Sequence, residues 1–334
     1  MLIVLLVIIL AGLLWSVLSW LRLPKDLNSD SLQPLWPGAL SSRWITVDGV
    51  RLHYLDQGEG LPVVLLHGFC ASSYTWREVI EPLSQRFRVI VPDLKGFGLS
   101  EKPHGDYRLE TQAHLIARML ESLNIQAAML VGNSMGGAIA MALALDHAEC
   151  VSGLILVDSA AFTISRRLHI LRRLLAIPIL SSVVTFLLYY SRRGLVRHML
   201  SLCYYDPSKV TDQQRTVYHA PLATQLGGRA SIWAGLAFDT TRIVRRASEI
   251  TQPALLVWGE TDRIIPMENA RRLSSLLPNA RMIVLGQCGH TPQEERPREF
   301  LEAILPFLME HTAARMSPLP TTRPQRQQEI DDPS

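Results

Sequence analysis

Short, almost uninterrupted apolar runs alternate with longer stretches of helical period along this chain. Alternating polar and apolar residues at 43–58, with an Asp48-Gly49 turn between them, predict a β-hairpin. The apolar runs that we predict to be strands are 62–68, 87–93, 127–133, 152–158, 254–259 and 280–286. Nearly continuous apolar strands are typical of a parallel sheet with both faces covered. Helical stretches at 109–124 and 134–147 separate several of them, so we predict an α/β fold with a mostly parallel, doubly wound sheet.

The connection that follows the predicted strand at 152–158 is far longer than the others. Its residues 162–246 contain an apolar helical stretch at 168–190, and thirteen Lys and Arg against three Asp and Glu. A loop of this length inside a compact domain usually has structure of its own or serves function. We predict a helical cap over an active site, inserted between two parts of one core, 42–161 and 247–311. The basic cap either rests on an anionic membrane surface or is simply solvated.

Residues 1–20 form one apolar run without a charged side chain. As a helix this run would be about 30 Å long, which matches the hydrocarbon thickness of a bilayer. Trp15 and Trp20 lie near its end and Arg22 follows, as is typical of a membrane interface. We therefore predict a single-pass anchor over 1–22, with a cleaved signal peptide as the alternative. The cations after the run indicate a cytoplasmic catalytic domain.

Two further segments outside the predicted core are rich in proline and polar residues. Residues 23–41 contain three prolines and are predicted to be a tether between the anchor and the core. Residues 312–334 also contain prolines among polar residues and are predicted to be a disordered tail.

Composition excludes several classes of function. The net charge of the 334 residues is only +3, so nothing in the overall charge predicts a nucleic-acid partner. The four cysteines lie far apart, which argues against a disulfide framework and against a paired-cysteine metal site. We predict neither a metal nor an organic cofactor.

The residues 132–136, Gly-Asn-Ser-Met-Gly, fit the pattern G-x-S-x-G. The pattern follows a predicted strand and opens a predicted helix, which is the context of a nucleophile elbow. A serine on such a turn is lifted out of the sheet, and the helix N-terminus places partial positive charge close to it. Ser134 is therefore the candidate nucleophile.

A serine hydroxyl needs a base, and the base needs a third group that orients it. In this architecture the acid and then the histidine follow the serine at the ends of later strands. Asp262 comes directly after the run 254–259 and His290 directly after 280–286, so they are the candidate acid and base. Glu260 and Asp158 are rival acids at strand ends.

An oxyanion hole is expected from two backbone N–H groups beside the serine. One belongs to the residue after the nucleophile, Met135, and the other to the loop after the predicted strand at 62–68, at Phe69. We interpret His67, in the same loop, as a residue that braces it and not as a base.

Five segments resemble the successive motifs of the α/β-hydrolase superfamily. They are HGFCASSYTWREVIEPL, DLKGFGLSEKP, LVGNSMGGAIAMALA, WGETDRIIP and CGHTPQEERP, and the resemblance covers about 45–162 and 250–310. Within the superfamily, the chain is most similar to bacterial lipases and esterases with a GNSMGG elbow and to membrane-anchored monoacylglycerol lipases. The resemblance implies the same site: Ser134, His290 and Asp262, with the N–H groups of Phe69 and Met135.

These observations predict a membrane-anchored serine hydrolase of carboxylic esters. The anchor and the apolar cap favour a lipidic, acylglycerol-type ester and contact with membrane lipid. Hydrolysis proceeds through an acyl-enzyme, as a serine nucleophile requires.

Three alternatives remain open at this point. Hydrolases of meta-cleavage products, which break C–C bonds, share the GNSMGG elbow, but they usually have tryptophan after the histidine, where this chain has Thr291. Haloalkane dehalogenases and epoxide hydrolases share other motifs, but their elbow nucleophile is aspartate. A non-catalytic binding module on the same fold is the third alternative.

Overall fold

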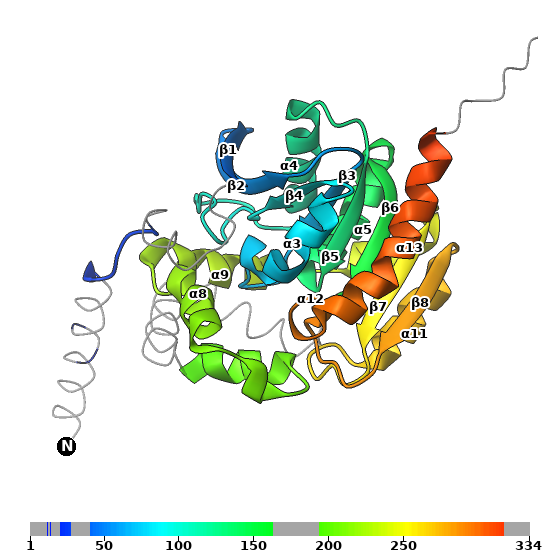
Figure 1. Ribbon diagram of the computed structural model, residues 1–334. Helices are drawn as coiled ribbons and strands as arrows, with labels where there is room; N and C mark the ends of the chain where they lie inside the picture. The colour runs from blue at the N-terminus through cyan, green and yellow to red at the C-terminus, as the bar shows by residue number, and fades with distance from the viewer. Residues whose placement is uncertain (1–11, 13, 15–20, 28–40, 163–193, 317–334) are drawn as a thin grey trace, which may run out of the picture.

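The computed structural model describes residues 12, 14, 21–27, 41–162 and 194–316. These residues form an eight-stranded sheet in the order β1-β2-β4-β3-β5-β6-β7-β8 (Figure 1). β2 pairs antiparallel with β1 and β4, and the other neighbours are parallel. The strands are β1 Ser42–Val47, β2 Val50–Gln57, β3 Pro62–Leu66, β4 Arg88–Pro92, β5 Ala128–Asn133, β6 Val151–Val157, β7 Ala254–Gly259 and β8 Ala280–Leu285. The predicted hairpin and mostly parallel sheet are therefore confirmed.

The strands are apolar on both faces because both faces are buried. In β5, Ala128 and Leu130 belong to one core cluster, whereas Met129 and Val131 belong to the cluster on the opposite face. Successive side chains of a strand point to opposite faces, so a strand between two helix layers needs apolar residues at every position. This is the physical reason for the uninterrupted apolar runs in the sequence.

Two layers of helices cover the sheet (Figure 1). Helices α4 Leu109–Ser122, α5 Met135–Asp146 and α11 Met267–Leu276 pack against one face. Helices α3 Arg77–Ser84 and α13 Pro297–Met316 pack against the other, and the short α12 Pro292–Glu295 directly precedes α13. All residues of α5 from Met135 to Ala144 are buried, so the helix after the predicted elbow lies inside the molecule. That position holds the elbow rigidly at the end of β5.

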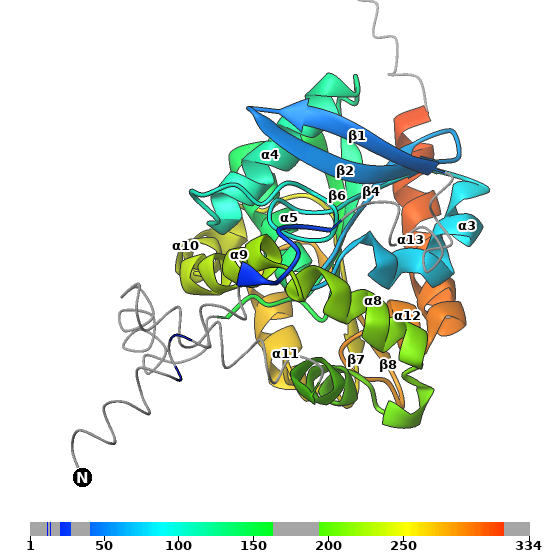
Figure 2. The same ribbon diagram turned by 90° about the vertical axis from the view of Figure 1, so that its left-hand side faces the viewer.

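The described part of the predicted cap, residues 194–246, is helical. A helix over 194–203 leads to α8 Asp212–Leu222, α9 Gln225–Ala237 and α10 Thr241–Arg246. The Thr211 hydroxyl accepts the N–H of Gln214 in a capping box, which explains why α8 starts there. Figure 2 shows α8 and α9 side by side across the near face of the molecule. The apolar stretch at 168–190 lies entirely within 163–193, which is outside the described residues.

The ends of the chain are described in part. Residues 21–27 of the predicted anchor and tether lie against the cap, where the N–H groups of Gln225 and Leu226 donate to Pro24 O and Lys25 O. Among the described residues no helix has both the length and the apolar character needed to cross a bilayer, and most of the predicted anchor, 1–11, 13 and 15–20, falls outside them. α13 continues to Met316, past the boundary at 312 where we expected the tail to begin. The rest of that tail lies outside the described residues.

Candidate active site

Ser134 stands between β5 and α5 in a backbone conformation that side chains rarely adopt. Its φ is +53° and its ψ is −116°. The flanking glycines make the turn possible, because a Cβ on Gly132 would lie 2.4 Å from Gly136 O and a Cβ on Gly136 would lie 2.1 Å from Leu66 O. The strained serine and the close approach of glycine backbone are the features of a nucleophile elbow.

The loop after β3 lies directly beside this elbow. A Cβ on Gly68 would lie 3.2 Å from Ser134 Cβ, so the backbone leading to Phe69 contacts the serine. Met135 is the first residue of α5, and N–H groups in the first turn of a helix have no partner within the helix. The two predicted oxyanion-hole residues therefore border Ser134 on both sides. The Phe69 ring is 45% exposed and packs edge-on against Phe97.

The predicted base and acid form a buried hydrogen-bonded pair. His290 Nδ1 lies 2.7 Å from Asp262 Oδ2. The other carboxylate oxygen of Asp262 accepts the N–H groups of Ile264 and Ile265 at 2.7 and 2.9 Å, which holds the carboxylate in place. Because an ionised carboxylate only accepts, we assign the proton of the imidazole to Nδ1. His290 Nε2 is then left as the basic nitrogen, as a general base requires.

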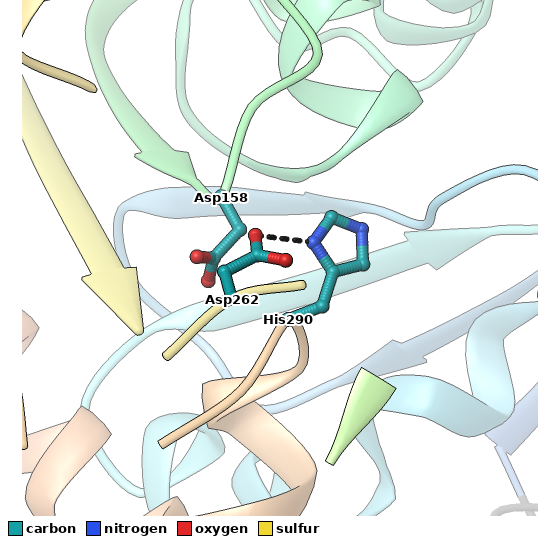
Figure 3. A group of neighbouring side chains, drawn as sticks. All are labelled: Asp158, Asp262 and His290. Atoms are coloured by element: carbon teal, nitrogen blue, oxygen red, sulfur yellow. Dashed lines mark hydrogen bonds and ion pairs between the residues drawn. The ribbon is translucent and has the colours of Figure 1, made fainter. Parts of the chain in front are cut away.

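A second buried carboxyl group lies behind this pair. Figure 3 shows the carboxyl group of Asp262 between Asp158 and the imidazole of His290. Asp158 is fully buried at the end of β6, and its Oδ1 accepts the N–H of Gly259 at 2.9 Å. Burial and the negative charge of Asp262 raise the pKa of Asp158 well above its ordinary value. Asp262 therefore bonds the imidazole, while Asp158 holds its proton to a higher pH than an ordinary aspartate does.

The loop that carries His290 is tied to the elbow and to the cap. The side-chain amide of Asn133, the residue before Ser134, donates to His290 O at 3.0 Å. The N–H of His290 donates to Cys203 O at 2.6 Å. The backbone of the predicted base is thus hydrogen-bonded to the residue that directly precedes the predicted nucleophile. Asn133 was not among the predicted site residues, although its place inside the G-x-S-x-G pattern could have indicated it.

The rival residues at the strand ends do not take part in the pair. Glu260 is exposed, and its carboxylate accepts the N–H of Gln287 at 3.3 Å. His67 donates from Nδ1 to Gly68 O at 2.8 Å and accepts the N–H of Leu94 at Nε2 at 3.0 Å. With both ring nitrogens used and a pKa lowered by burial, His67 braces its loop, as we expected.

Asp158, Asp262 and His290 also form the one group of three or more acidic, histidine or cysteine residues, within the described part of the chain, whose ligand atoms all lie within 4.8 Å of one another. Their bonds limit what a cation could do there. Both oxygens of Asp262 already accept hydrogen bonds, and Asp158 Oδ1 accepts the N–H of Gly259. A metal ion at this position would have to displace the hydrogen bond between His290 and Asp262.

Comparison with known proteins agrees with this geometry. The sequence profile of the alpha/beta hydrolase fold family matches residues 62–297. An uncharacterized hydrolase, YugF of Bacillus subtilis, is 33% identical over 80% of this chain and 97% of its own length. The 2-hydroxymuconate semialdehyde hydrolase of Pseudomonas sp. is 31% identical over 82% of this chain and 96% of its own.

The solved structures widen the range of similar enzymes. A bacterial membrane phospholipase A superposes with a TM-score of 0.65 at 27% identity, over 92% of this chain and 97% of its own. Other similar proteins are named as a meta-cleavage product hydrolase, an esterase and a haloalkane dehalogenase. By sequence, the named relatives support the C–C hydrolase alternative better than the ester hydrolase that we expected. The family profile spans most of the chain, the eight-stranded sheet is mostly parallel, as we expected, and the relatives are hydrolases. The chain therefore belongs to the alpha/beta hydrolase fold family.

Proposed function

We propose that this protein is a serine hydrolase with Ser134 as nucleophile, His290 as general base and Asp262 as the acid that orients it. Ser134 Oγ attacks a carbonyl carbon of the substrate while His290 Nε2 takes the hydroxyl proton. The N–H groups of Phe69 and Met135 bind the oxyanion. The bond to the leaving group then breaks, and His290 returns the proton to that group. Water repeats these steps on the acyl-enzyme and releases the acid.

The observation that carries this proposal is the 2.7 Å bond between His290 Nδ1 and Asp262 Oδ2 beside a serine held at a φ of +53°. A non-catalytic module would have no need for a strained serine, because such a backbone conformation costs about 1–3 kcal/mol. The pair that orients the imidazole and the strained turn occur together where the mechanism needs both. This combination favours catalysis over the binding module.

The first substrate class that we propose is a ketone whose C–C bond is hydrolysed. Several named relatives support it, among them a hydrolase of a hexadienoic acid and a hydrolase of a semialdehyde, which are 30% and 31% identical to this chain. In this reaction Ser134 forms a C–O bond to the carbonyl carbon, and the C–C bond breaks. The electron pair then moves to the leaving carbon, which takes its proton from His290. The substrate must be able to delocalise that pair, as a vinylogous diketone does.

The second substrate class is a carboxylic ester, and a specific observation favours it. The membrane phospholipase A aligns with 92% of this chain, whereas the similar meta-cleavage product hydrolase aligns with 80%. The additional aligned length suits a protein with the apolar residues 1–20, which we propose to be a single-pass membrane anchor. On this alternative the substrate is an acylglycerol-type lipid that reaches the cap from the bilayer.

A fluorophosphonate probe tests the proposal independently of substrate class. Such a probe phosphonylates a serine only when a base activates it, so the wild-type protein should be labelled and Ser134→Ala should not. Ser231→Ala, which removes a hydroxyl of the cap helix α9, is the matched control and should be labelled normally. Folded wild-type protein that takes no label would exclude the serine hydrolase and favour the binding module.

The substrate class is then decided by direct comparison of turnover. A vinylogous 1,5-diketone is measured against p-nitrophenyl and monoacylglycerol esters under the same conditions. A higher kcat/KM for the diketone would support C–C hydrolysis, and a higher value for the esters would support the lipid esterase.

A further inference from the structure

The carboxylate of Glu295 joins the cap to the loop of the candidate base. Its Oε2 accepts the N–H of Gly289 at 2.8 Å and the N–H of Tyr205 at 2.9 Å. Its Oε1 accepts the N–H of Asp206 at 2.8 Å. Glu295 is only 5% exposed, so three backbone donors surround a buried carboxylate. Two of these donors belong to the cap, and the third belongs to the residue next to His290.

The same short stretch of the cap also contacts His290 directly. The N–H of His290 donates to Cys203 O at 2.6 Å. A Cβ on Gly289 would lie 2.3 Å from Cys203 O and 2.8 Å from Tyr205 N, so the two backbones are in close contact. On its other side the His290 carbonyl accepts the amide of Asn133. The histidine is therefore held between the elbow and the cap.

The neighbouring carboxylate, Glu294, has a different set of partners. It accepts hydrogen bonds from Thr75, Arg77, Tyr204, Gln214 and Tyr218. These bonds attach α8 and the chain before it to the core, and all of them come from side chains. Glu294 thus attaches the cap to the core. Glu295 instead binds the cap and the His290 loop through the same carboxylate.

We propose that Glu295 is a positioning residue that makes the orientation of His290 depend on the seating of the cap. When residues 203–206 of the cap are in place, the N–H groups around Glu295 and the carbonyl of Cys203 set the peptide of His290, and with it the imidazole. When they move, the imidazole loses its alignment with Ser134 and Asp262. Binding of substrate beneath the cap and activation of the serine are thereby coupled. This inference rests on the proposed function, because it assigns His290 the part of the base.

Glu295→Gln is the sharpest single test, since it keeps size and shape. A carboxylate can accept all three N–H groups, but an amide offers one oxygen and places an NH₂ group against the remaining donors. A misplacement of a catalytic group by about 1 Å can reduce the rate about 100-fold. We expect Glu295→Gln to lower kcat and the rate of fluorophosphonate labelling by that order, with little change in KM. Glu295→Asp, which retains the charge, should recover part of the loss.

Tyr218→Phe is the matched control. It removes one bond from Glu294 to the cap and leaves every bond of Glu295 in place. We expect it to change KM and to leave the labelling rate of Ser134 within about threefold of wild type, because the hydrogen bonds that hold the His290 loop are retained. Equal loss of labelling in Tyr218→Phe and Glu295→Gln would overturn the proposal, because cap attachment alone would then explain it.

Hydrogen exchange measured by mass spectrometry gives a readout that does not depend on activity. In Glu295→Gln the amides of Tyr205, Asp206 and His290 should exchange faster together, while the strand β5 should remain protected. Normal labelling and unchanged exchange in Glu295→Gln would refute the coupling. Failure of the wild-type protein to take the label would instead refute the proposed function, so the two failures can be told apart.

Discussion

The two sides of the candidate active site are held by different kinds of interaction. On the core side, backbone geometry positions the groups: Ser134 occupies a strained turn, and Gly132 and Gly136 allow main chains to touch. On the cap side, two buried carboxylates, Glu294 and Glu295, accept hydrogen bonds from segments that lie far apart in the sequence. The position of the candidate nucleophile is therefore set by the backbone at the end of the sheet. The position of the cap, by contrast, is set by hydrogen bonds to a few side-chain oxygens.

The most severe test of the core side is Ser134→Ala. Removal of the nucleophile of a catalytic triad lowers kcat by about 10⁶-fold. We expect this loss with little change in thermal unfolding, since the turn is held by its neighbours and the serine hydroxyl contributes little to packing. Purified protein is assayed on the better of the two substrate classes, with Ser231→Ala as the control. A loss below about tenfold would mean that the chemistry does not pass through this serine.

The next largest effect on kcat is expected for one of the two carboxyl groups at the strand ends, Asp262, and not for the other, Asp158. Asp262→Asn should lower kcat by about 10⁴-fold, because the amide favours the wrong tautomer of the imidazole. Asp158→Asn should lower kcat by less than about tenfold, because Asp262 bonds the imidazole whereas Asp158 bonds the N–H of Gly259. Steady-state kinetics of both variants decide the matter. A larger loss in Asp158→Asn would transfer the role of the acid to Asp158.

The protonation of Asp158 also predicts how stability depends on pH. Its pKa is raised in the folded protein, so the contribution of the protonated Asp158 to the free energy of unfolding is fully present below the ordinary pKa near 3.8. This contribution is lost as the pH rises through the raised pKa. The stability of Asp158→Asn does not change in this way, because an amide does not lose a proton in this pH range. Denaturant unfolding of both proteins from pH 4 upward should therefore show the variant gaining on wild type as the pH rises. A constant difference across that range would contradict the assignment.

A third carboxylate tests whether the core also depends on side-chain oxygens. Asp93 accepts the N–H of Ser73 and of Leu99, at 2.7 and 2.8 Å, and lies 2.9 Å from His53 Nδ1. Breaking such a buried arrangement costs about 3–5 kcal/mol, so we expect Asp93→Ala to lower the free energy of unfolding by that amount. Glu302→Ala, which removes an exposed carboxylate paired with Arg298, is the control and should leave the free energy of unfolding nearly unchanged.

Acid titration sharpens the same prediction. Burial by itself raises the pKa of Asp93, but the hydrogen bond and charge of His53, with His67 and Ser73, hold that pKa at about 2. The stabilisation from Asp93 is present above its ordinary value near 3.8 and is lost as the pH falls toward 2. Denaturant unfolding between pH 4 and pH 2 should show wild type losing this advantage over Asp93→Ala. An advantage that stays constant through that range would disprove the assigned cause.

The smallest effect is expected on the cap side. Tyr218→Phe removes one of the five side chains that donate to Glu294, which corresponds to about 1 kcal/mol. We expect KM to rise by a few fold and the melting temperature to fall slightly, as measured by differential scanning fluorimetry and initial rates. A change in kcat as large as that of Asp262→Asn would abolish the distinction between the two sides of the site.

Much of the fold and of the candidate site could be predicted from the sequence. The strands followed from apolar runs and the hairpin from an Asp-Gly turn, because both reflect local backbone preferences and burial on two faces. Ser134 and His290, with Asp262 as the preferred one of three candidate acids, followed from their places after strands, since the carboxyl ends of parallel strands meet at one edge. Most of the predicted anchor, and the part of the cap at 163–193, lie outside the described residues and stay predictions.

Only the tertiary structure decided which carboxyl group contacts the imidazole, because Glu260, Asp262 and Asp158 all follow strands and only packing distinguishes them. It also revealed Asn133, Glu294 and Glu295 as partners of the histidine loop and the cap. Their contacts join residues up to 219 positions apart, from Thr75 to Glu294. A sequence expresses local preferences through its period and its turns. The partner of a buried polar group depends instead on which distant segments the fold packs together.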